Sequence, residues 1–436
     1  MERHGRRPYS WAILVVAMVA VVACSDEGDG EDVPAEAPGT LLMGEAEPET
    51  EPDISDDDFE AFSEDNRRFA FDLFETLRQE EEGNLFVSPH SISTALAMTY
   101  GGADGTTADE MAQALRFEMG DEVLHPAFNR LARALDAREE VELEVVNQTW
   151  GQEGYPFIED YLDLLVRHYD AGMYVVDYGD DPDGIREGIN QWVEDQTAGH
   201  IDDLLPPGSI DALTRLVLVN AIYFKADWKR PFSADQTSDG SFELLDGTTA
   251  EVEMMSHDEP EIAAYIDDGQ SVGLSMAYEG EDISMVAMKP AEADAFSEWE
   301  EALDRAYFDE LVTSMEDKMG VIQFPKFEDK GDYDLVPVMQ ALGMAEAFED
   351  GVADFGKMID VEAAGGSPFI TGIFHQTFVE VDEKGTEAAA ATGVVVGDES
   401  APVIDFQVSF DRPFYYAIYD HDAESILFMG RMMDPS

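Results

Sequence analysis

The sequence predicts a mixed α+β domain, in which several helices pack on a large mixed β-sheet with smaller sheets beside it. Three observations indicate this: helical spacing of apolar residues after residue 56, a long β-rich run at Leu213–Phe224, and alternating strands and turns in the last third. With 436 residues and 44% hydrophobic content, the chain can bury one large core or two modest ones. No long linker or internal repeat interrupts residues 56–436, so we expect one domain there.

Apolar residues at helical spacing predict the first elements of this domain. Phe59–Gln79 carries an apolar stripe, and the Gly83-Asn84 step ends it. Ser91–Tyr100 is rich in alanine, leucine and methionine, which predicts a helix that is buried on most sides. Further helices are expected at Asp109–Leu115, His125–Leu135 and Ile185–Thr197.

The strands are predicted from alternation and from continuous apolar runs. Val141–Gln152 alternates as a half-buried strand does. Leu213–Phe224 is too continuously apolar for an edge strand, which places it inside the sheet. Two apolar strands, Phe414–Tyr419 and Ser425–Met429, close the chain.

The first residues are typical of an export signal. Three arginines precede the uncharged run Trp11–Ala23, which is too short to predict a membrane span. The run ends in Val-Val-Ala followed by Cys24 and resembles the lipobox of bacterial lipoproteins, in which cleavage precedes an acylated cysteine. An ordinary export signal with an incidental cysteine is the alternative. Because Cys24 is the only cysteine, an internal disulfide is impossible, and we expect a signal peptide at 1–23 and lipid attachment at Cys24.

An acidic segment follows the cysteine. Residues 25–60 contain fifteen acidic side chains and no basic ones, with few large apolar groups to bury. Such a composition predicts a disordered, self-repelling tether, which we assign to residues 24–55. The domain would then occupy residues 56–436 and be held away from a membrane.

The net charge of the whole chain is −71, and the acidic residues are spread along its length. Self-repulsion of this size is relieved by salt, so the composition is typical of a salt-adapted, halophilic organism. Attraction to a basic partner is the alternative. Nucleic acid is excluded as a partner, because a polyanion would be repelled.

The most informative stretch is Asp382–Thr392, which follows the strand-like run Phe378–Val381. Its glycine, polar residue and four alanines can extend as a strand but carry almost no bulk. The segment resembles the hinge of the reactive loop in inhibitory serpins. Four other segments resemble serpin signatures in the same order along the chain: Asn84–Ala103, Val219–Phe232, Phe324–Glu328 and Arg412–Arg431.

The resemblance implies a serpin fold with an exposed reactive loop, and it implies roles for particular residues. Four polar residues would form the shutter region, where the main sheet opens: Ser88, Ser91, Asn220 and His375. The hinge would comprise Glu383, Gly385, Thr386, Glu387, Ala388, Ala389, Ala390, Ala391 and Thr392.

The same resemblance implies a mechanism. A target protease attacks the loop, becomes esterified to the residue before the cut, and is trapped as the loop inserts into the sheet as a new strand. Alternation along the hinge fits insertion: one face carries the uncharged residues Thr386, Ala388, Ala390, Thr392, Val394 and Val396. No proline lies between Gly385 and Ala401 to interrupt a ladder.

Counting fourteen residues on from Gly385, as the resemblance implies, places the reactive bond at Glu399-Ser400. Counting back from Pro413 lands near Pro402, so the loop would be slightly longer than usual. Glu399 suits a protease with a basic specificity pocket, and Asp398 suits an aspartate-specific enzyme. Cleavage at Val396 or Ala401 stays open, since the acids here can simply reflect the acidity of the chain.

We therefore expect a protease inhibitor that traps a serine or cysteine protease, with preference for an acidic or small residue. The alternative is a non-inhibitory serpin, a binding module that is cleaved as a plain substrate. No nucleophile elbow, metal-binding helix or paired-cysteine site is present, so we expect no enzyme activity, metal or cofactor. The protein is expected to be a monomer, exported and anchored by lipid at a periplasmic face or cell surface.

Overall fold

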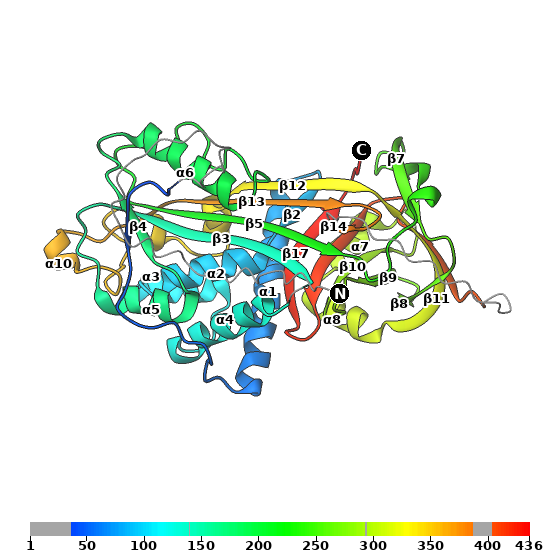
Figure 1. Cartoon of the computed structure of the whole chain (residues 1–436), viewed down its shortest axis with the longest axis horizontal. Coiled ribbons are helices and arrows are strands. Elements are labelled where there is room, and N and C mark those ends of the chain that lie inside the picture. Colours follow the sequence, from blue (N-terminus) through cyan, green and yellow to red (C-terminus); the bar gives the residue numbers. More distant parts are fainter. Residues whose placement is uncertain (1–35, 139, 293, 387–402) are drawn as a thin grey trace, which may run out of the picture. The chain divides into compact units, whose positions relative to one another are not determined.

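The computed structural model describes residues 36–138, 140–292, 294–386 and 403–436. All of them belong to one structural unit that spans residues 35–436. Two β-sheets and a set of helices build this unit (Figure 1). The expected α+β class is confirmed.

The main sheet has seven strands in the order β1-β4-β3-β5-β14-β13-β12. The central strands β5 and β13 run parallel, and β3 and β12 pair antiparallel on their outer sides. The bounds are β1 Thr40–Leu42, β3 Val141–Gln152, β4 Met173–Val176, β5 Leu216–Asp227, β12 Phe327–Asp334, β13 Ile370–Val381 and β14 Gly385–Thr386.

A second sheet has ten strands, which form the order β2-β17-β16-β10-β9-β8-β11-β7-β6 with β15 paired to β11. Its strands are β2 Leu85–Val87, β6 Ser238–Glu243, β7 Thr249–Ser256, β8 Glu261–Asp267, β9 Ser271–Ala277, β10 Ile283–Pro290, β11 Glu316–Pro325, β15 Phe406–Ser409, β16 Phe414–Asp420 and β17 Ser425–Met432. The two closing strands expected from the sequence are β16 and β17, which lie between β2 and β10 near one end of this order.

The five predicted helices are present as α1, α2, α3, α4 and α6, with small shifts at their ends, and the sequence analysis did not predict the other helices. The bounds are α1 Asp56–Glu80, α2 Pro89–Tyr100, α3 Gly105–Leu115, α4 Asp121–Asp136, α5 Glu159–Tyr169, α6 Pro182–Gln196, α7 Phe296–Ala302, α8 Arg305–Ser314, α9 Val336–Ala341 and α10 Val361–Ala364, with short 3₁₀ turns at Ala234–Gln236 and Glu346–Phe348. Capping explains several starts: Ser88 precedes α2 and accepts a hydrogen bond from the Ser91 amide, and Pro89 occupies the first turn.

Helices cover both faces of the main sheet, which gives β5 two different environments. Its even-numbered residues, such as Leu218 and Ile222, pack into the large core that includes α1 and α2. Its odd-numbered residues, such as Val217 and Val219, pack into a smaller core under α6. Figure 1 shows α6 on the side of the sheet opposite α1–α5. A strand beside β5 must therefore satisfy two apolar surfaces at once.

Residues 36–55 pack on the domain, so the predicted tether at 24–55 is wrong for this part. Strand β1 adds to the edge of β4, with Leu41 opposite Tyr174. Further along, the Glu49 carbonyl accepts hydrogen bonds from Asn129 at 2.9 Å and from Arg133 at 2.7 Å. The composition argument counted side chains, whereas this segment is held mostly by main-chain groups at a free sheet edge. The domain therefore begins before residue 56, and residues 24–35 lie outside the described residues.

Candidate functional site

The candidate site is the seam between the parallel strands β5 and β13. The two strands pair from Ile370–Leu216 up to Phe378–Tyr223. Above that level the strand β14 lies between them, antiparallel to both. Thr386 pairs with Val381 of β13 on one side and with Ala226 of β5 on the other. At the upper end of the sheet, the short strand β14 therefore already separates β5 from β13.

A tight turn at Asp382–Gly385 delivers the chain into this gap. The Asp382 carboxylate accepts hydrogen bonds from the amides of Lys384 and Gly385, at 2.8 and 3.2 Å. Gly385 passes so close to the Ala226 carbonyl that any Cβ there would overlap it. Only glycine fits this crossing. The glycine of the predicted hinge is thus explained by a close approach of two main chains.

Main-chain contacts to Trp228 and Phe232 hold the turn. The Trp228 ring nitrogen donates to the Asp382 carbonyl at 3.0 Å, and the Trp228 amide donates to Lys384 at 2.7 Å. The Phe232 amide donates to the Glu383 carbonyl at 2.7 Å. Trp228 in turn stacks on Tyr278, with ring centroids 4.4 Å apart. The Val219–Phe232 segment therefore supplies both a central strand and the hydrogen-bond donors that hold the turn at Asp382–Gly385.

The first two hinge side chains are also bound. Glu383 accepts a hydrogen bond from the Thr237 hydroxyl at 2.7 Å and pairs with Lys326 at 3.4 Å. Burial alone would raise the pKa of Glu383, but the Thr237 hydroxyl and the Lys326 ammonium outweigh it, so the pKa is lowered. Thr386 is fully buried, and its hydroxyl lies 2.9 Å from that of Tyr278. The side chains of Glu383 and Thr386 are therefore held by hydrogen bonds and are shielded, at least in part, from water.

Lower on the seam, the structure brings the four predicted shutter residues together. Ser88, Ser91, Asn220 and His375 are all fully buried. Asn220 faces His375 directly across the two parallel strands. The Asn220 amide nitrogen donates to the Ser91 hydroxyl at 2.5 Å and also to Asn147 of β3. The cluster thus spans β3, β5, β13 and the start of α2.

His375 links the two strands through a defined tautomer. Its Nε2 accepts from the Ser88 amide at 3.1 Å, so the proton of the neutral ring lies on Nδ1. Nδ1 then donates to the Asn220 side-chain oxygen. Burial lowers the pKa of His375 to about 3, which keeps the ring neutral. Hydrogen bonds rather than charges therefore close the seam at its middle.

Several predicted residues lie outside the described residues. These are Glu387, Ala388, Ala389, Ala390, Ala391 and Thr392 of the hinge, the reactive-bond candidates Asp398, Glu399, Ser400 and Ala401, and Cys24. Of the other predicted hinge residues, Gly385 and Thr386 form β14 at the top of the seam, and Glu383 lies in the turn that precedes it.

Sequence reasoning missed three residues of the site: Asn147, Thr237 and Tyr278. Asn147 could have been found, because it is a polar residue inside an alternating strand. Thr237 and Tyr278 gave no such signal, since they sit in connections between strands and reach the hinge only through the fold. In the part of the chain described by the structure, no cluster of His, Cys, Asp or Glu has the arrangement of a metal site. The same residues contain no helix of the length and apolarity that membrane crossing requires.

Comparison with known proteins identifies the architecture. Residues 64–435 match the family described as serpin (serine protease inhibitor). The chain is 34% identical to Serpin B13 from Homo sapiens over 390 residues, which cover 84% of this chain and 98% of the relative. It is 36% identical to Serpin B10 from Otolemur garnettii over 394 residues, with the same coverage of each chain.

A solved structure agrees along nearly the whole length. The thermophilic serpin tengpin in its native state superposes with a TM-score of 0.80 and 28% identity, covering 91% of this chain and 99% of tengpin. The family match at residues 64–435 includes every strand of the two described sheets except β1. The chain belongs to the serpin family, the serine protease inhibitors.

Proposed function

We propose that this serpin is of the inhibitory type and traps its target protease by inserting the cleaved loop into the seam. One observation carries the proposal: β14 already lies between β5 and β13, antiparallel to both. A loop continuing in this direction would replace the direct pairing of two parallel strands by two antiparallel ladders, the more stable arrangement per residue. Strand addition then drives the reaction, and the uncleaved form is held by a barrier.

Extending the register of β14 down the seam supports this reading. Each step along the loop moves one residue back along β5, so even-numbered loop residues share a face with even-numbered β5 residues. That face is the large core. The small, uncharged residues Thr386, Ala388, Ala390, Thr392, Val394 and Val396 would therefore enter the core, and no charge would be buried there.

The same register, if the inserted loop continued it, would align Thr392 with the shutter. Thr392 would then lie opposite Asn220 on one side and His375 on the other. These are the two residues whose direct hydrogen bond closes the seam. A threonine hydroxyl both donates and accepts, so it can take over their bonds when the strands part. The polar cluster would thus exchange partners and leave no buried group unsatisfied.

We further propose Glu399-Ser400 as the reactive bond, with Asp398 or Ala401 as the alternative cleavage residue. A protease with a basic pocket, or one that accepts a small residue, would be the target. The chain itself would have no catalytic activity and need no cofactor. It would act as an exported monomer, attached to a membrane by acylated Cys24 and adapted to high salt by its charge of −71.

Thermal unfolding before and after cleavage tests insertion. Cleavage within 396–401 should raise the unfolding temperature sharply, because the freed loop completes the sheet. Ala388→Glu should abolish the rise, since it would place a carboxylate beside the fully buried Phe224. Glu387→Ala, at the adjacent residue whose partner in the register is the partly exposed Lys225, should retain it. A cleaved wild-type chain that unfolds at the temperature of the intact one would instead indicate a non-inhibitory serpin, cleaved as a plain substrate.

A further inference from the structure

Arg215 is a basic side chain without an acidic partner in a strongly acidic protein. The chain has 96 acids and only 25 lysines and arginines. Within the described ranges, every arginine except Arg167 and Arg215 forms an ion pair of 4.0 Å or less. Arg167 is exposed, whereas Arg215 is half-buried immediately before β5. Arg215 therefore has charge and hydrogen-bonding capacity available for a ligand.

The guanidinium of Arg215 is positioned, and one of its edges is open. Its Nη1 donates to the carbonyls of Ala212, at 3.3 Å, and Thr214, at 2.8 Å. Among the residues that the structure describes, no acceptor bonds to its Nε or Nη2. These two nitrogens form an edge that can bind both oxygens of a carboxylate at once. The geometry of Arg215 therefore fits a planar anion.

Arg215 borders an open pocket of about 440 Å³, which we call the Arg215 pocket. Half of its lining consists of glycine and alanine, namely Gly154, Gly179, Ala212, Ala363 and Ala364. Side chains this small leave the space in front of the guanidinium unfilled. The pocket is therefore large enough for a small organic molecule.

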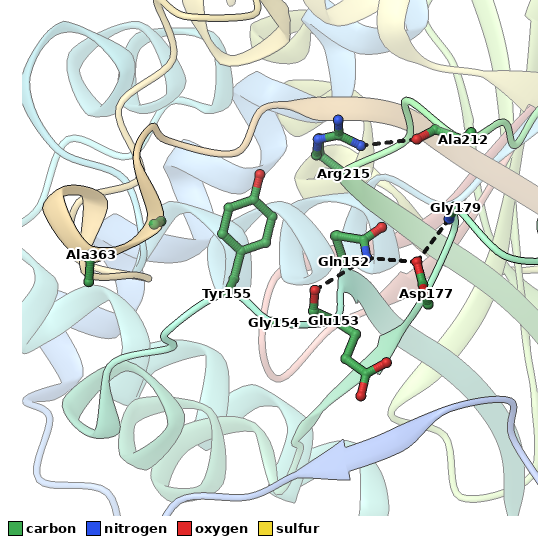
Figure 2. Close-up of a pocket in the computed structure, with 10 residues that line it drawn as sticks. Gln152, Glu153, Gly154, Tyr155, Asp177, Gly179, Ala212, Arg215 and Ala363 are labelled. Carbon is green, nitrogen blue, oxygen red and sulfur yellow. Dashed lines mark hydrogen bonds between the residues drawn. The ribbon is translucent and has the colours of Figure 1, made fainter.

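The two acids of the Arg215 pocket do not occupy the guanidinium. The Asp177 carboxylate accepts from the Gly179 amide at 3.0 Å and from the Gln152 side chain at 3.2 Å. Figure 2 shows the Glu153 side chain pointing away from Arg215. Both charges still repel an anion, and the repulsion grows with the charge of the ligand. A singly charged carboxylate is therefore favoured over a doubly charged phosphate.

Tyr155 adds an aromatic ring and a hydroxyl to the same pocket. Its ring lies at 72° to the ring of Phe157, with centroids 6.4 Å apart, so these two rings do not stack. In Figure 2 the Tyr155 hydroxyl and the Arg215 guanidinium point to the same end of the pocket. The ring can pack against a flat apolar group, and the hydroxyl can donate to a carboxylate. These groups together fit a small aromatic carboxylate.

The Arg215 pocket lies at the lower end of the seam between β5 and β13. The Arg215 amide donates to the Thr371 hydroxyl of β13 at 3.1 Å, and the Arg215 carbonyl accepts from the Gln152 amide of β3 at 3.0 Å. Ala363 and Ala364 belong to α10, which precedes β13 in the chain. The lining therefore comes from both sides of the seam, and a ligand that contacts both binds best while they stay together.

We propose that the Arg215 pocket binds a small aromatic carboxylate, which pairs with Nε and Nη2 of Arg215 and packs on Tyr155. The bound ligand also stabilises the closed lower end of the seam. This second part rests on the proposed function, because insertion of a strand along the whole seam would separate the two sides of the pocket. The ligand therefore binds the intact chain more tightly than the cleaved, inserted chain.

Titration calorimetry of the full, intact chain at constant ionic strength tests the site. Benzoate is the probe, and benzamide is the matched control, since it has nearly the same shape but no charge. Benzoate should saturate the chain at about millimolar concentration, which is the range for a ligand with so few atoms. Benzamide should bind at least about tenfold more weakly, because it forms no charge-assisted pair.

Variants assign the binding to the pocket. Arg215→Gln should weaken benzoate about tenfold and leave benzamide nearly unchanged, and Arg215→Lys, which keeps the charge without the two-nitrogen edge, should lie between. Tyr155→Ala should weaken both probes. Arg167→Gln removes the other arginine without an ion pair in the described ranges and should bind benzoate as the wild type does. Circular dichroism melting checks that each variant folds.

The outcomes test the site separately from its effect on the seam. Absence of saturable benzoate binding at about tenfold higher concentrations, equal affinity for the two probes, or no effect of Arg215→Gln would overturn the site. Inorganic phosphate that binds more tightly than benzoate would overturn the choice of a carboxylate. Equal affinity of benzoate for the intact and the cleaved chain would overturn the effect on the seam.

Failure of the proposed function has a different signature. If cleavage does not raise the unfolding temperature in the absence of benzoate, loop insertion is wrong, whatever the affinity of the Arg215 pocket. If cleavage raises it and benzoate binds only the intact chain, both proposals are supported.

Discussion

Replacing Asn220 by leucine should destabilise the intact protein more than an ordinary buried substitution. Asn220 is fully buried, and its side chain bonds to Ser91, Asn147 and His375. Leucine has a similar volume but removes all three contacts. It also leaves the Nδ1 proton of His375 without an acceptor, because Nε2 of that ring is occupied by the Ser88 amide.

The magnitude follows from these bonds. Three hydrogen bonds at about 1 kcal/mol each, with a desolvation penalty of about 1 to 3 kcal/mol for the orphaned donor, predict a total of about 4 to 6 kcal/mol. His375→Phe in the same chain removes the orphaned donor, so the losses of the two single changes should not add in full. The double variant is expected to be about 1 to 3 kcal/mol more stable than the sum of the single changes.

Urea unfolding of the intact chain at pH 7, followed by tryptophan fluorescence, measures these values. Near-equal slopes of the transitions would show that the variants change stability rather than compactness. A loss below about 1 kcal/mol for Asn220→Leu, or strict additivity in the double variant, would refute the view that a bonded network closes the seam.

Three further predictions follow. Thr386→Arg places a charge at a fully buried position of the hinge, so protease mixed with this variant should cleave it without forming a complex, as gels will show. The folded-state pKa of His375 is about 3 against an ordinary 6.5, so the unfolded chain binds more protons between these values. This histidine should therefore lower the free energy of unfolding by about 1.4 kcal/mol per pH unit as pH falls below 6, and His375→Phe should reduce that slope in urea titrations. Removing residues 36–55 should cost a few kcal/mol in the same assay, whereas Glu49→Ala, which keeps the bonded carbonyl, should cost far less.

Much of the fold could be predicted because its elements carry strong local patterns. The continuous apolar run around Val219 is buried on both faces, and that alone indicates a central strand. The seam could be predicted only through resemblance, since nothing local says that Asn220 faces His375 across parallel strands. Such pairings depend on long-range register.

Residues 36–55 show where a prediction from local composition fails. Their composition includes few large apolar groups, and that argument predicts disorder. The edge of β4 nevertheless offers free main-chain groups, to which Thr40–Leu42 bind whatever their side chains are. Edge pairing of this kind depends on a sheet formed by residues far along the chain, so local composition does not reveal it.

The most direct test of the trap is to mix the full chain in high salt with a glutamyl endopeptidase and run denaturing gels with intact mass spectrometry. Loop insertion predicts a stable band at the summed mass of the two proteins, with the cut after Glu399. A complex formed after cleavage elsewhere in 394–402 would support the inhibitory mechanism but place the reactive bond at that other position. Complete cleavage without a complex, with this and every other protease tried, would contradict the inhibitory mechanism.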